Sequence, residues 1–401
     1  MAENFNGEKR MIKNRFDDSF ASKIEDDLLS LRVYTSRLLG EEEDLVLHGG
    51  GNTSVKIGDY LYVKGSGWDL ASIEKEGFAA VKLETLKEMA KRDTLKDSQM
   101  VKLQREAMRD KNSPNPSIEA ILHAIIPYKF VDHTHADSIV TISNTPDGKK
   151  ILKEIFKEKA LIIDYVMPGF LLAKEVYNKS KDLNWDSIDM IILLNHGIFT
   201  FDNDAKRSYE KMIKAVNMAE EFLQKNASLK IDEISFNEIP KEDKDLLEKE
   251  ISKLRGTKIR AIPLNTKFSK YFANLKETEE IVKNGVLTPE HVIRIKPFPL
   301  ILDKNIKEEI DKFTKDYKAY FEKFATDEIM LDLAPRWGVY KNKDVLIFPK
   351  DEKEEKILKD IVTHTIKAML RAQKLGGWKS LSQRDLFSME YWELEQAKLK
   401  K

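Results

Sequence analysis

Two histidines separated by one residue are the sharpest chemical signal in the sequence, in the segment Asp132-His133-Thr134-His135-Ala136-Asp137. The run from Phe130 to His135 is typical of a β-strand, in which residues two apart point to the same side. Two imidazoles on one side can bind a single cation, with Zn–N distances of ~2.0–2.1 Å. Such pairs also arise by chance, so the pair alone leaves metal binding open.

A third histidine and a carboxylate strengthen the case for a metal. His196 follows the apolar run Met190 to Leu194, and a histidine at the end of a buried strand can reach a pocket or can simply be a capped core residue. Glu119 lies in the first turn of a helix predicted to begin at Ser117. The helix dipole stabilises a carboxylate at that position, and this interaction could be the only role of Glu119. Three histidines with an open fourth position describe a catalytic zinc site.

Another histidine, His123, follows Glu119 by four residues and therefore shares its helix face. His123 could be a further metal ligand, but the favoured interpretation is that it orients the carboxylate of Glu119 or simply packs. Cysteine is absent from the chain, so any metal must use histidine or carboxylate ligands.

Glycine-rich turns supply a second kind of site. The segments Gly49-Gly50-Gly51-Asn52-Thr53-Ser54 and Gly65-Ser66-Gly67 offer backbone N–H groups and hydroxyls, and Ser117 adds a hydroxyl at a helix start. Such groups suit a phosphate, although glycines in hairpins usually serve only the turn. The sequence has no nucleotide-binding Gly-x-x-x-x-Gly-Lys-[Ser/Thr] segment, and no Gly-x-Gly-x-x-Gly follows a strand.

The elements that must position these residues alternate between strands and helices. The patterns predict a first helix within 17–40, a hairpin of two strands over 54–57 and 60–64, and a second helix from Ser117. Three further strands are predicted over 130–135, 162–166 and 190–194, and a long helix over 205–225. We predict a catalytic domain over 1–235, a linker over 236–257, where the composition becomes acidic and lysine-rich, and a smaller α/β accessory domain over 258–401.

Composition narrows the possible partners and location. The 401 residues carry 68 Lys+Arg and 68 Asp+Glu, so the formal charge is zero and no broad nucleic-acid surface is expected. The N-terminus lacks the apolar core of a signal peptide, and no apolar run reaches the ~20 residues of a membrane helix. We predict a cytoplasmic protein without nucleic-acid or membrane partners.

Five elements, in order, resemble the class II aldolase/adducin family. They are a glycine-asparagine loop, a phosphate turn, an acid/base segment, a histidine pair and a late Asn-His-Gly, here Gly51-Asn52, Ser66-Gly67, Ser117-Ile118-Glu119, His133-Thr134-His135 and Asn195-His196-Gly197. Together they are strongly specific, although each alone is weak. Relatives often have two serines before the glutamate, and here the second is Ile118, so one hydroxyl that would bind the phosphate is missing.

The second half of the chain resembles the aldolase half of bifunctional rhamnulose-1-phosphate aldolase/short-chain dehydrogenase proteins. The similar segments are 287–294, Ala334-Pro335-Arg336 and 391–399. In those proteins a Rossmann domain follows the last segment, whereas this sequence ends there. We therefore expect a stand-alone aldolase module that does not bind NAD tightly.

The resemblance implies an α/β/α fold with a largely antiparallel central sheet, often in homo-oligomers. It also implies that His133, His135 and His196 bind Zn²⁺ or another divalent cation, and that Glu119 moves a carbon-bound proton. Asn52, Ser66, Gly67 and Ser117 would bind the phosphate of a sugar-phosphate substrate. The implied reaction is cleavage of a ketose 1-phosphate, such as L-rhamnulose 1-phosphate, to dihydroxyacetone phosphate and an aldehyde such as lactaldehyde.

Two other functions stay open. The same family includes metal-dependent epimerases and a dehydratase, which keep the metal and change the reaction. It also includes adducin-like binding proteins that do not catalyse a reaction, and in such a protein the metal-ligand residues are expected to be lost. Here all three histidines and Glu119 are present.

Overall fold

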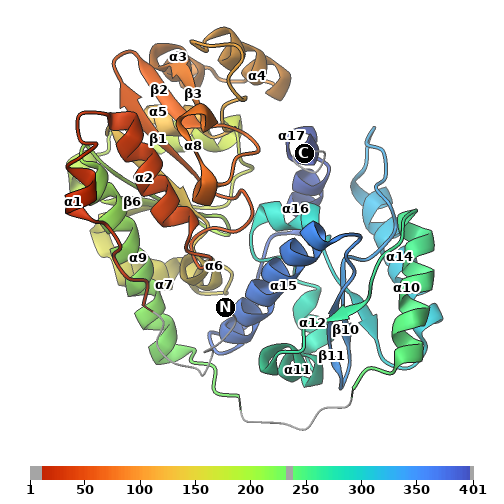
Figure 1. Cartoon of the computed structure of the whole chain (residues 1–401). Coiled ribbons are helices and arrows are strands. Elements are labelled where there is room, and N and C mark those ends of the chain that lie inside the picture. The colour runs from red at the N-terminus through yellow and green to blue at the C-terminus, as the bar shows by residue number, and fades with distance from the viewer. Residues whose placement is uncertain (1–10, 232–237, 398–401) are drawn as a thin grey trace. The chain divides into compact units, whose positions relative to one another are not determined.

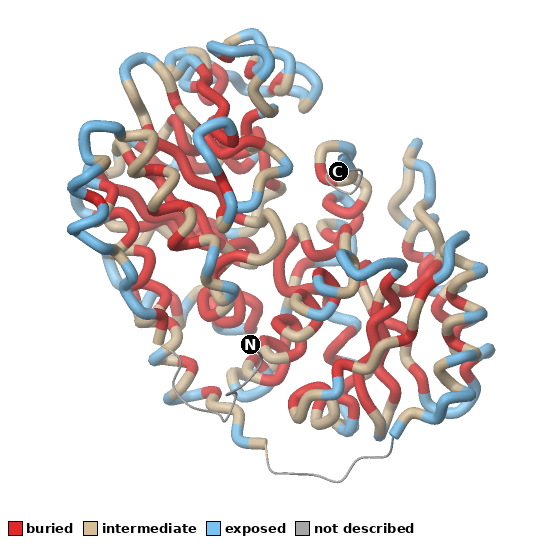
Figure 2. Tube along the Cα trace, in the orientation of Figure 1, coloured by how far each residue is buried: buried red, intermediate tan, exposed pale blue. Residues whose placement is uncertain are grey.

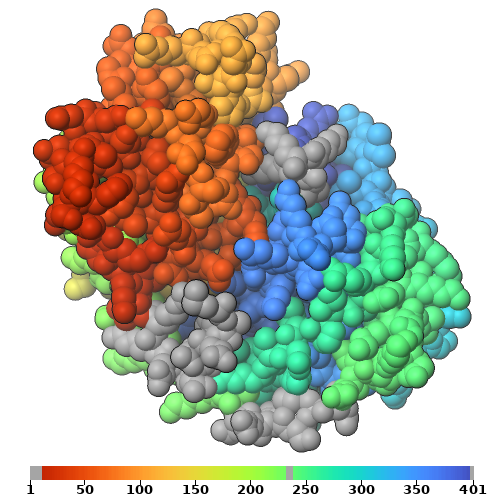
Figure 3. Space-filling view, in the orientation of Figure 1, coloured from red at the N-terminus to blue at the C-terminus, as the bar shows by residue number. Residues whose placement is uncertain are grey.

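The computed structural model describes residues 11–231 and 238–397, which form two compact units, each with its own sheet (Figure 1). The first unit comprises 10–143 and 148–222, and the second comprises 144–147 and 223–400, apart from the residues outside the described ranges. Each unit is therefore built mainly from one continuous stretch of chain, as the colours of Figure 3 also show.

The first unit is built on a seven-stranded sheet of order β3-β2-β1-β4-β7-β6-β5. Neighbouring strands are antiparallel except for β5 and β6, which are parallel, so the predicted largely antiparallel sheet is confirmed. The strands are β1 (Asn52–Ile57), β2 (Tyr60–Lys64), β3 (Phe78–Lys82), β4 (Phe130–Thr134), β5 (Ala160–Ile163), β6 (Met190–Leu193) and β7 (Gly197–Asp202).

Helices cover this sheet because alternate side chains of each strand face opposite sides. On β1, Val55 packs with Leu28, Leu29 and Leu31 of the first long helix, whereas Ser54 turns to the other side and bonds His123. The helices of this unit are α1 (Asp18–Ala21), α2 (Leu28–Gly40), α3 (Leu83–Lys91), α4 (Asp97–Glu106), α5 (Ala120–Ile125), α6 (Asp137–Ser143), α7 (Gly148–Phe156), α8 (Phe170–Lys179) and α9 (Ala205–Asn226).

The second unit has a four-stranded sheet of order β8-β11-β10-β9, with only β9 and β10 parallel. An α/β accessory unit was predicted, and its strands are largely buried, as in the first sheet (Figure 2). Its elements are α10 (Lys241–Arg255), β8 (Ile262–Pro263), α11 (Lys267–Asn274), α12 (Thr278–Val282), α13 (Val292–Ile295), β9 (Leu300–Leu302), α14 (Ile306–Phe324), β10 (Trp337–Tyr340), β11 (Asp344–Ile347), α15 (Glu352–Gln373), α16 (Gln383–Glu390) and α17 (Glu393–Gln396).

The predicted linker over 236–257 needs correction. Residues 236 and 237 lie outside the described part, but 241–255 form helix α10, and the two compact units divide earlier, between residues 222 and 223. Leu247 and Ile251 are fully buried in the core of the second unit. Charged residues dominate the other faces of α10, so its narrow apolar stripe was too sparse for the sequence pattern to reveal.

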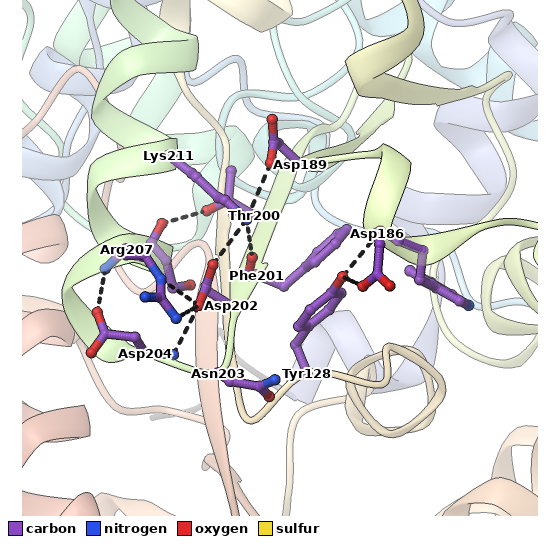
Figure 4. A network of polar contacts seen from close by, with 12 residues as sticks. Tyr128, Asp186, Asp189, Thr200, Phe201, Asp202, Asn203, Asp204, Arg207 and Lys211 are labelled. Atoms are coloured by element: carbon purple, nitrogen blue, oxygen red, sulfur yellow. Dashed lines mark hydrogen bonds and ion pairs between the residues drawn. The ribbon is translucent and has the colours of Figure 1, made fainter.

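A polar network fixes the strand ends remote from the glycine turns (Figure 4). The ammonium of Lys211 on α9 lies 3.1 Å from Asp189, just before β6, and 3.0 Å from Asp202 at the end of β7. Tyr128 donates a hydrogen bond to Asp186, and burial together with this carboxylate raises the pKa of Tyr128 to about 12. These contacts hold α9, β6 and β7 in register. Within the described ranges, no helix is long and apolar enough to cross a membrane.

Candidate metal centre and active site

The paired histidines project from the end of central strand β4. His133 lies opposite Phe199 of β7 and stacks on its ring, with centroids 4.0 Å apart. The Nδ1 of His133 lies 3.0 Å from the carbonyl oxygen of Ile198, which can only accept a hydrogen bond. Nδ1 therefore carries the proton, and the Nε2 lone pair is available to a metal. The Nε2 of His135 lies 3.1 Å from that atom.

The third histidine lies in the tight turn between β6 and β7. Its N–H donates to the carbonyl of Leu193, and the preceding Asn195 has φ 60°, a left-handed conformation that asparagine tolerates well. Gly197 follows, and a Cβ there would lie 2.3 Å from the carbonyl oxygen of Thr134 on β4. Only glycine lets the turn approach β4 this closely, and the approach brings His196 beside the histidine pair.

The three imidazoles fit a divalent metal. One ligand nitrogen from each of His133, His135 and His196 lies within 4.8 Å of the other two. A tetrahedral ion with ~2.0–2.1 Å Zn–N bonds separates its ligand nitrogens by about 3.3 Å, close to the 3.1 Å between the first pair. The histidines predicted from the sequence therefore come together, while their role as metal ligands stays a prediction.

The carboxylate of Glu119 lies beside the histidines and is almost fully buried. Its Oε2 is 3.5 Å from Nε2 of His133, and its Oε1 is 3.8 Å from Nε2 of His196. The helix was expected to start at Ser117 and to include Glu119 in its first turn. Instead α5 begins at Ala120, and Glu119 is the residue before it, with no side-chain capping bond. Its carboxylate is thus directed to the histidines and not to the helix N-terminus.

A short relay of hydrogen bonds holds this carboxylate. The Nδ2 of Asn52 donates to Oε2 of Glu119 at 2.7 Å, because a carboxylate can only accept. The Oδ1 of Asn52 therefore faces His123, whose Nε2 must donate, and Nδ1 of His123 accepts from Ser54 at 2.8 Å. Burial lowers the pKa of His123 well below its usual value, so the ring is neutral.

This relay was only partly visible in the sequence. The i,i+4 spacing correctly suggested that His123 could orient Glu119, but the amide of Asn52 mediates the contact. Asn52 is the cross-strand partner of His133, a pairing between residues 81 apart that no local pattern encodes. One predicted phosphate ligand thus contacts the acid/base candidate.

The other predicted phosphate ligands lie on two adjoining loops. The N–H of Ser66 donates to the carbonyl of Asn115, and the N–H of Ser117 donates to that of Lys64. The register of β1 and β2, continued by two residues, brings Asn52 level with Gly65. Ser66 and Gly67 therefore adjoin Ser117, as expected for one binding site, and their phosphate role stays a prediction.

A buried ion pair that the sequence did not predict anchors strand β4 on the face of the sheet opposite His133. The carboxylate of Asp132, next to His133 but facing the opposite side of the sheet, lies 2.6 Å from Arg32 of α2, and both side chains are fully buried. Asp132 also accepts a 2.5 Å hydrogen bond from Ser208 of α9. Burial lowers the pKa of Arg32 and Asp132 opposes that shift. The pair ties α2 and α9 to the strand that carries the histidines.

Two family models match successive parts of the chain. The class II aldolase and adducin N-terminal domain matches residues 31–223, and the second domain of class II aldolase matches residues 244–399. A Bacillus subtilis protein named as an uncharacterized oxidoreductase, YuxG, is 28% identical over 97% of this chain. The chain spans 60% of that relative's length.

Two further relatives each match about half of the chain. The L-fuculose phosphate aldolase of Methanocaldococcus jannaschii is 29% identical, over 42% of this chain and 80% of its own length. The solved N-terminal class II aldolase domain of a conserved Thermoplasma acidophilum protein is 37% identical, over 54% of this chain and 99% of that domain, with a TM-score of 0.46.

Proposed function

The chain belongs to the class II aldolase and adducin family, and on that premise we propose that it is a metal-dependent aldolase. Its substrate would be a ketose 1-phosphate such as L-rhamnulose 1-phosphate, cleaved to dihydroxyacetone phosphate and an aldehyde such as lactaldehyde. The observation that carries this proposal is the position of Glu119, whose carboxylate oxygens lie 3.5 and 3.8 Å from two of the three candidate ligand nitrogens.

Each residue would have a separate task in the reaction. When bound by His133, His135 and His196, a divalent ion would stabilise negative charge on the substrate oxygens as a Lewis acid. The Oε1 of Glu119, which has no hydrogen-bond partner within the described ranges, would deliver a proton to the carbon of dihydroxyacetone phosphate that loses the aldehyde. Asn52 would hold Oε2 and so keep Oε1 directed at that carbon.

The phosphate would bind the two adjoining loops, which gives a direct test. Ser66→Asp should raise KM by about 10-fold or more, because it places a negative charge beside the phosphate. Two like charges this close repel each other by about 1 kcal/mol or more even when exposed to water, and about 1.4 kcal/mol corresponds to a factor of ten. Steady-state kinetics with a phosphorylated ketose measures this. Ser187→Asp, which adds the same charge at an exposed position just before β6, at the strand ends remote from the glycine turns, should leave KM nearly unchanged. Equal KM values for wild type and Ser66→Asp would indicate a substrate without phosphate.

We further propose that the protein uses zinc, forms a homo-oligomer and acts in the cytoplasm. The zinc proposal rests on three nitrogen ligands and an open position. The oligomer and the cytoplasmic location rest on the family resemblance and on the absence of cysteine.

Product analysis separates the proposed reaction from the related ones. The metal-loaded protein is incubated with several ketose 1-phosphates, and the products are followed by ¹³C NMR. We expect the signals of dihydroxyacetone phosphate and an aldehyde. A stereoisomer of the substrate would indicate an epimerase, a dehydrated product would indicate a dehydratase, and unchanged substrate throughout would favour an adducin-like binding role.

A further inference from the structure

The second unit contains a groove that the proposed reaction does not use. It encloses about 370 Å³ among helix α12, helix α14, the start of α16 and the chain around strand β9. Every residue that lines it belongs to the second unit, so the groove lies wholly within that unit. Its volume falls within the range of ~300–1,000 Å³ that is usual for ligand sites.

The groove is elongated along helix α14. The residues of α14 that line it run from Glu309 to Lys323. This stretch is about 21 Å long, at a rise of 1.5 Å per residue. An extended chain advances about 3.4 Å per residue and covers the same distance in about six steps. The groove therefore has the length of a short extended peptide.

One wall of the groove is formed by the free edge of the second sheet. Strand β9 is the last strand in the order β8-β11-β10-β9, and no described strand pairs with its outer side. Ile301, in the middle of β9, lines the groove. The N–H and C=O groups that an edge strand directs away from its sheet can pair with another extended chain. The groove therefore offers main-chain hydrogen bonds to a peptide.

Apolar side chains line the middle of the groove. Val282 and Phe313 are almost fully buried, and Phe298 is partly buried. The ring centroid of Phe298 lies 5.7 Å from that of Phe313 and 6.1 Å from that of Tyr320, in edge-on contacts. An apolar side chain that packs on these rings would remove apolar area from water, so this part of the groove favours an apolar residue.

The charges along the sides of the groove neutralise one another. The ammonium of Lys283 lies 3.1 Å from the carboxylate of Glu279, and that of Lys312 lies 2.6 Å from the carboxylate of Asp316. A ligand therefore meets no excess of either charge between the two ends.

The two ends of the groove carry opposite charges without ion-pair partners among the described residues. Oε1 of Glu309 accepts hydrogen bonds from the N–H groups of residues 303–305, whereas Oε2 accepts none. The ammonium of Lys323 lies 3.5 Å from Oε1 of Gln383 and forms no ion pair with a described carboxylate. A ligand that complements the groove has a cation at one end and an anion at the other.

We propose that this groove binds an extended peptide segment of a partner protein, about seven residues long, which adds as a strand to β9. A basic side chain of the peptide lies against Glu309, and an acidic one lies against Lys323. Apolar side chains between them pack on Phe298 and Phe313. These side chains occupy every second position, because alternate residues of a strand face the same side. Peptide binding in this unit does not depend on aldolase activity.

Calorimetric titration of the full chain with a synthetic heptapeptide tests this site. The probe is Lys-Thr-Leu-Thr-Phe-Thr-Glu with blocked termini, in which the charged and apolar side chains share one face. We expect one peptide to bind per chain. Glu309→Gln should weaken binding about 5- to 10-fold, because a partly buried ion pair is lost. A probe with glutamine in place of its lysine should bind that variant no more weakly, since both changes remove the same contact.

Matched variants separate the groove from the rest of α14. Glu308→Gln removes an exposed carboxylate that does not line the groove, so it should leave the affinity unchanged. Ala319→Trp fills the groove from an exposed position and should abolish binding even if Glu309→Gln fails to fold. Lys318→Trp, at the exposed neighbouring position outside the groove, should bind as the wild type does.

Three results would overturn the proposal: no binding of the probe to the wild-type chain, equal binding to Ala319→Trp, or undiminished binding to Glu309→Gln. Dimers that Ala319→Trp dissociates, in a chain that does not bind the probe, would assign the groove to a second copy of the chain and would also overturn it.

Discussion

Glu119→Gln should reduce proton exchange at the hydroxymethyl carbon of dihydroxyacetone phosphate by about 10²–10⁴-fold, the usual contribution of a general acid or base. The amide has nearly the volume of the carboxylate, and its oxygen can still accept the hydrogen bond from Asn52, so the fold and the relay should persist. The amide cannot take up or deliver the proton. Deuterium incorporation in heavy water, followed by NMR, measures the exchange directly.

The specificity of that effect depends on two controls. Metal content of the Glu119→Gln variant should equal that of wild type, because the three histidines are intact. Glu84→Gln, on the exposed surface of α3 in the same unit, should exchange protons at the wild-type rate. A loss well below tenfold for Glu119→Gln would assign the proton transfer to another group.

His135→Ala should have the second large effect, the loss of most bound metal and of activity. Mutation of a residue that only hydrogen-bonds to a metal ligand typically weakens metal binding by about 10–100-fold. Removal of one of the three nitrogen ligands themselves should therefore weaken it by more than this. His135 is half-buried and follows the end of β4, so its truncation should leave the fold intact.

Metal analysis after equilibrium dialysis tests the His135 prediction. His291→Ala, which removes a histidine of the other unit, should retain the metal of the wild-type protein. Full metal content in His135→Ala would show that the ion is bound elsewhere, and the three-histidine site would then be rejected.

Local periodicity was enough to predict the strands that carry the histidines. Alternation placed His133 and His135 on one side, and the apolar run before His196 predicted a buried strand that opens into a turn. The structure agrees at β4 and β6. Local patterns were less reliable for helix ends, since Ser117 has the character of an N-cap but α5 begins three residues later.

Contacts between distant segments were beyond the reach of the sequence. Asn52 meets Glu119 and His123 only because β1 lies beside β4, and the Arg32–Asp132 ion pair joins residues 100 positions apart. A local pattern reports propensity and amphipathicity, whereas these contacts depend on the order of strands in the sheet.

We propose that His133, His135, His196 and Glu119 together cleave a ketose 1-phosphate with the help of a metal. The most direct measurement is the rate at which L-rhamnulose 1-phosphate releases dihydroxyacetone phosphate, with the protein as purified, after chelation, and after zinc is restored. We predict release that chelation abolishes and zinc recovers, and that neither Glu119→Gln nor His135→Ala supports. Release that is equally fast after complete removal of the metal would show that cleavage does not require the metal.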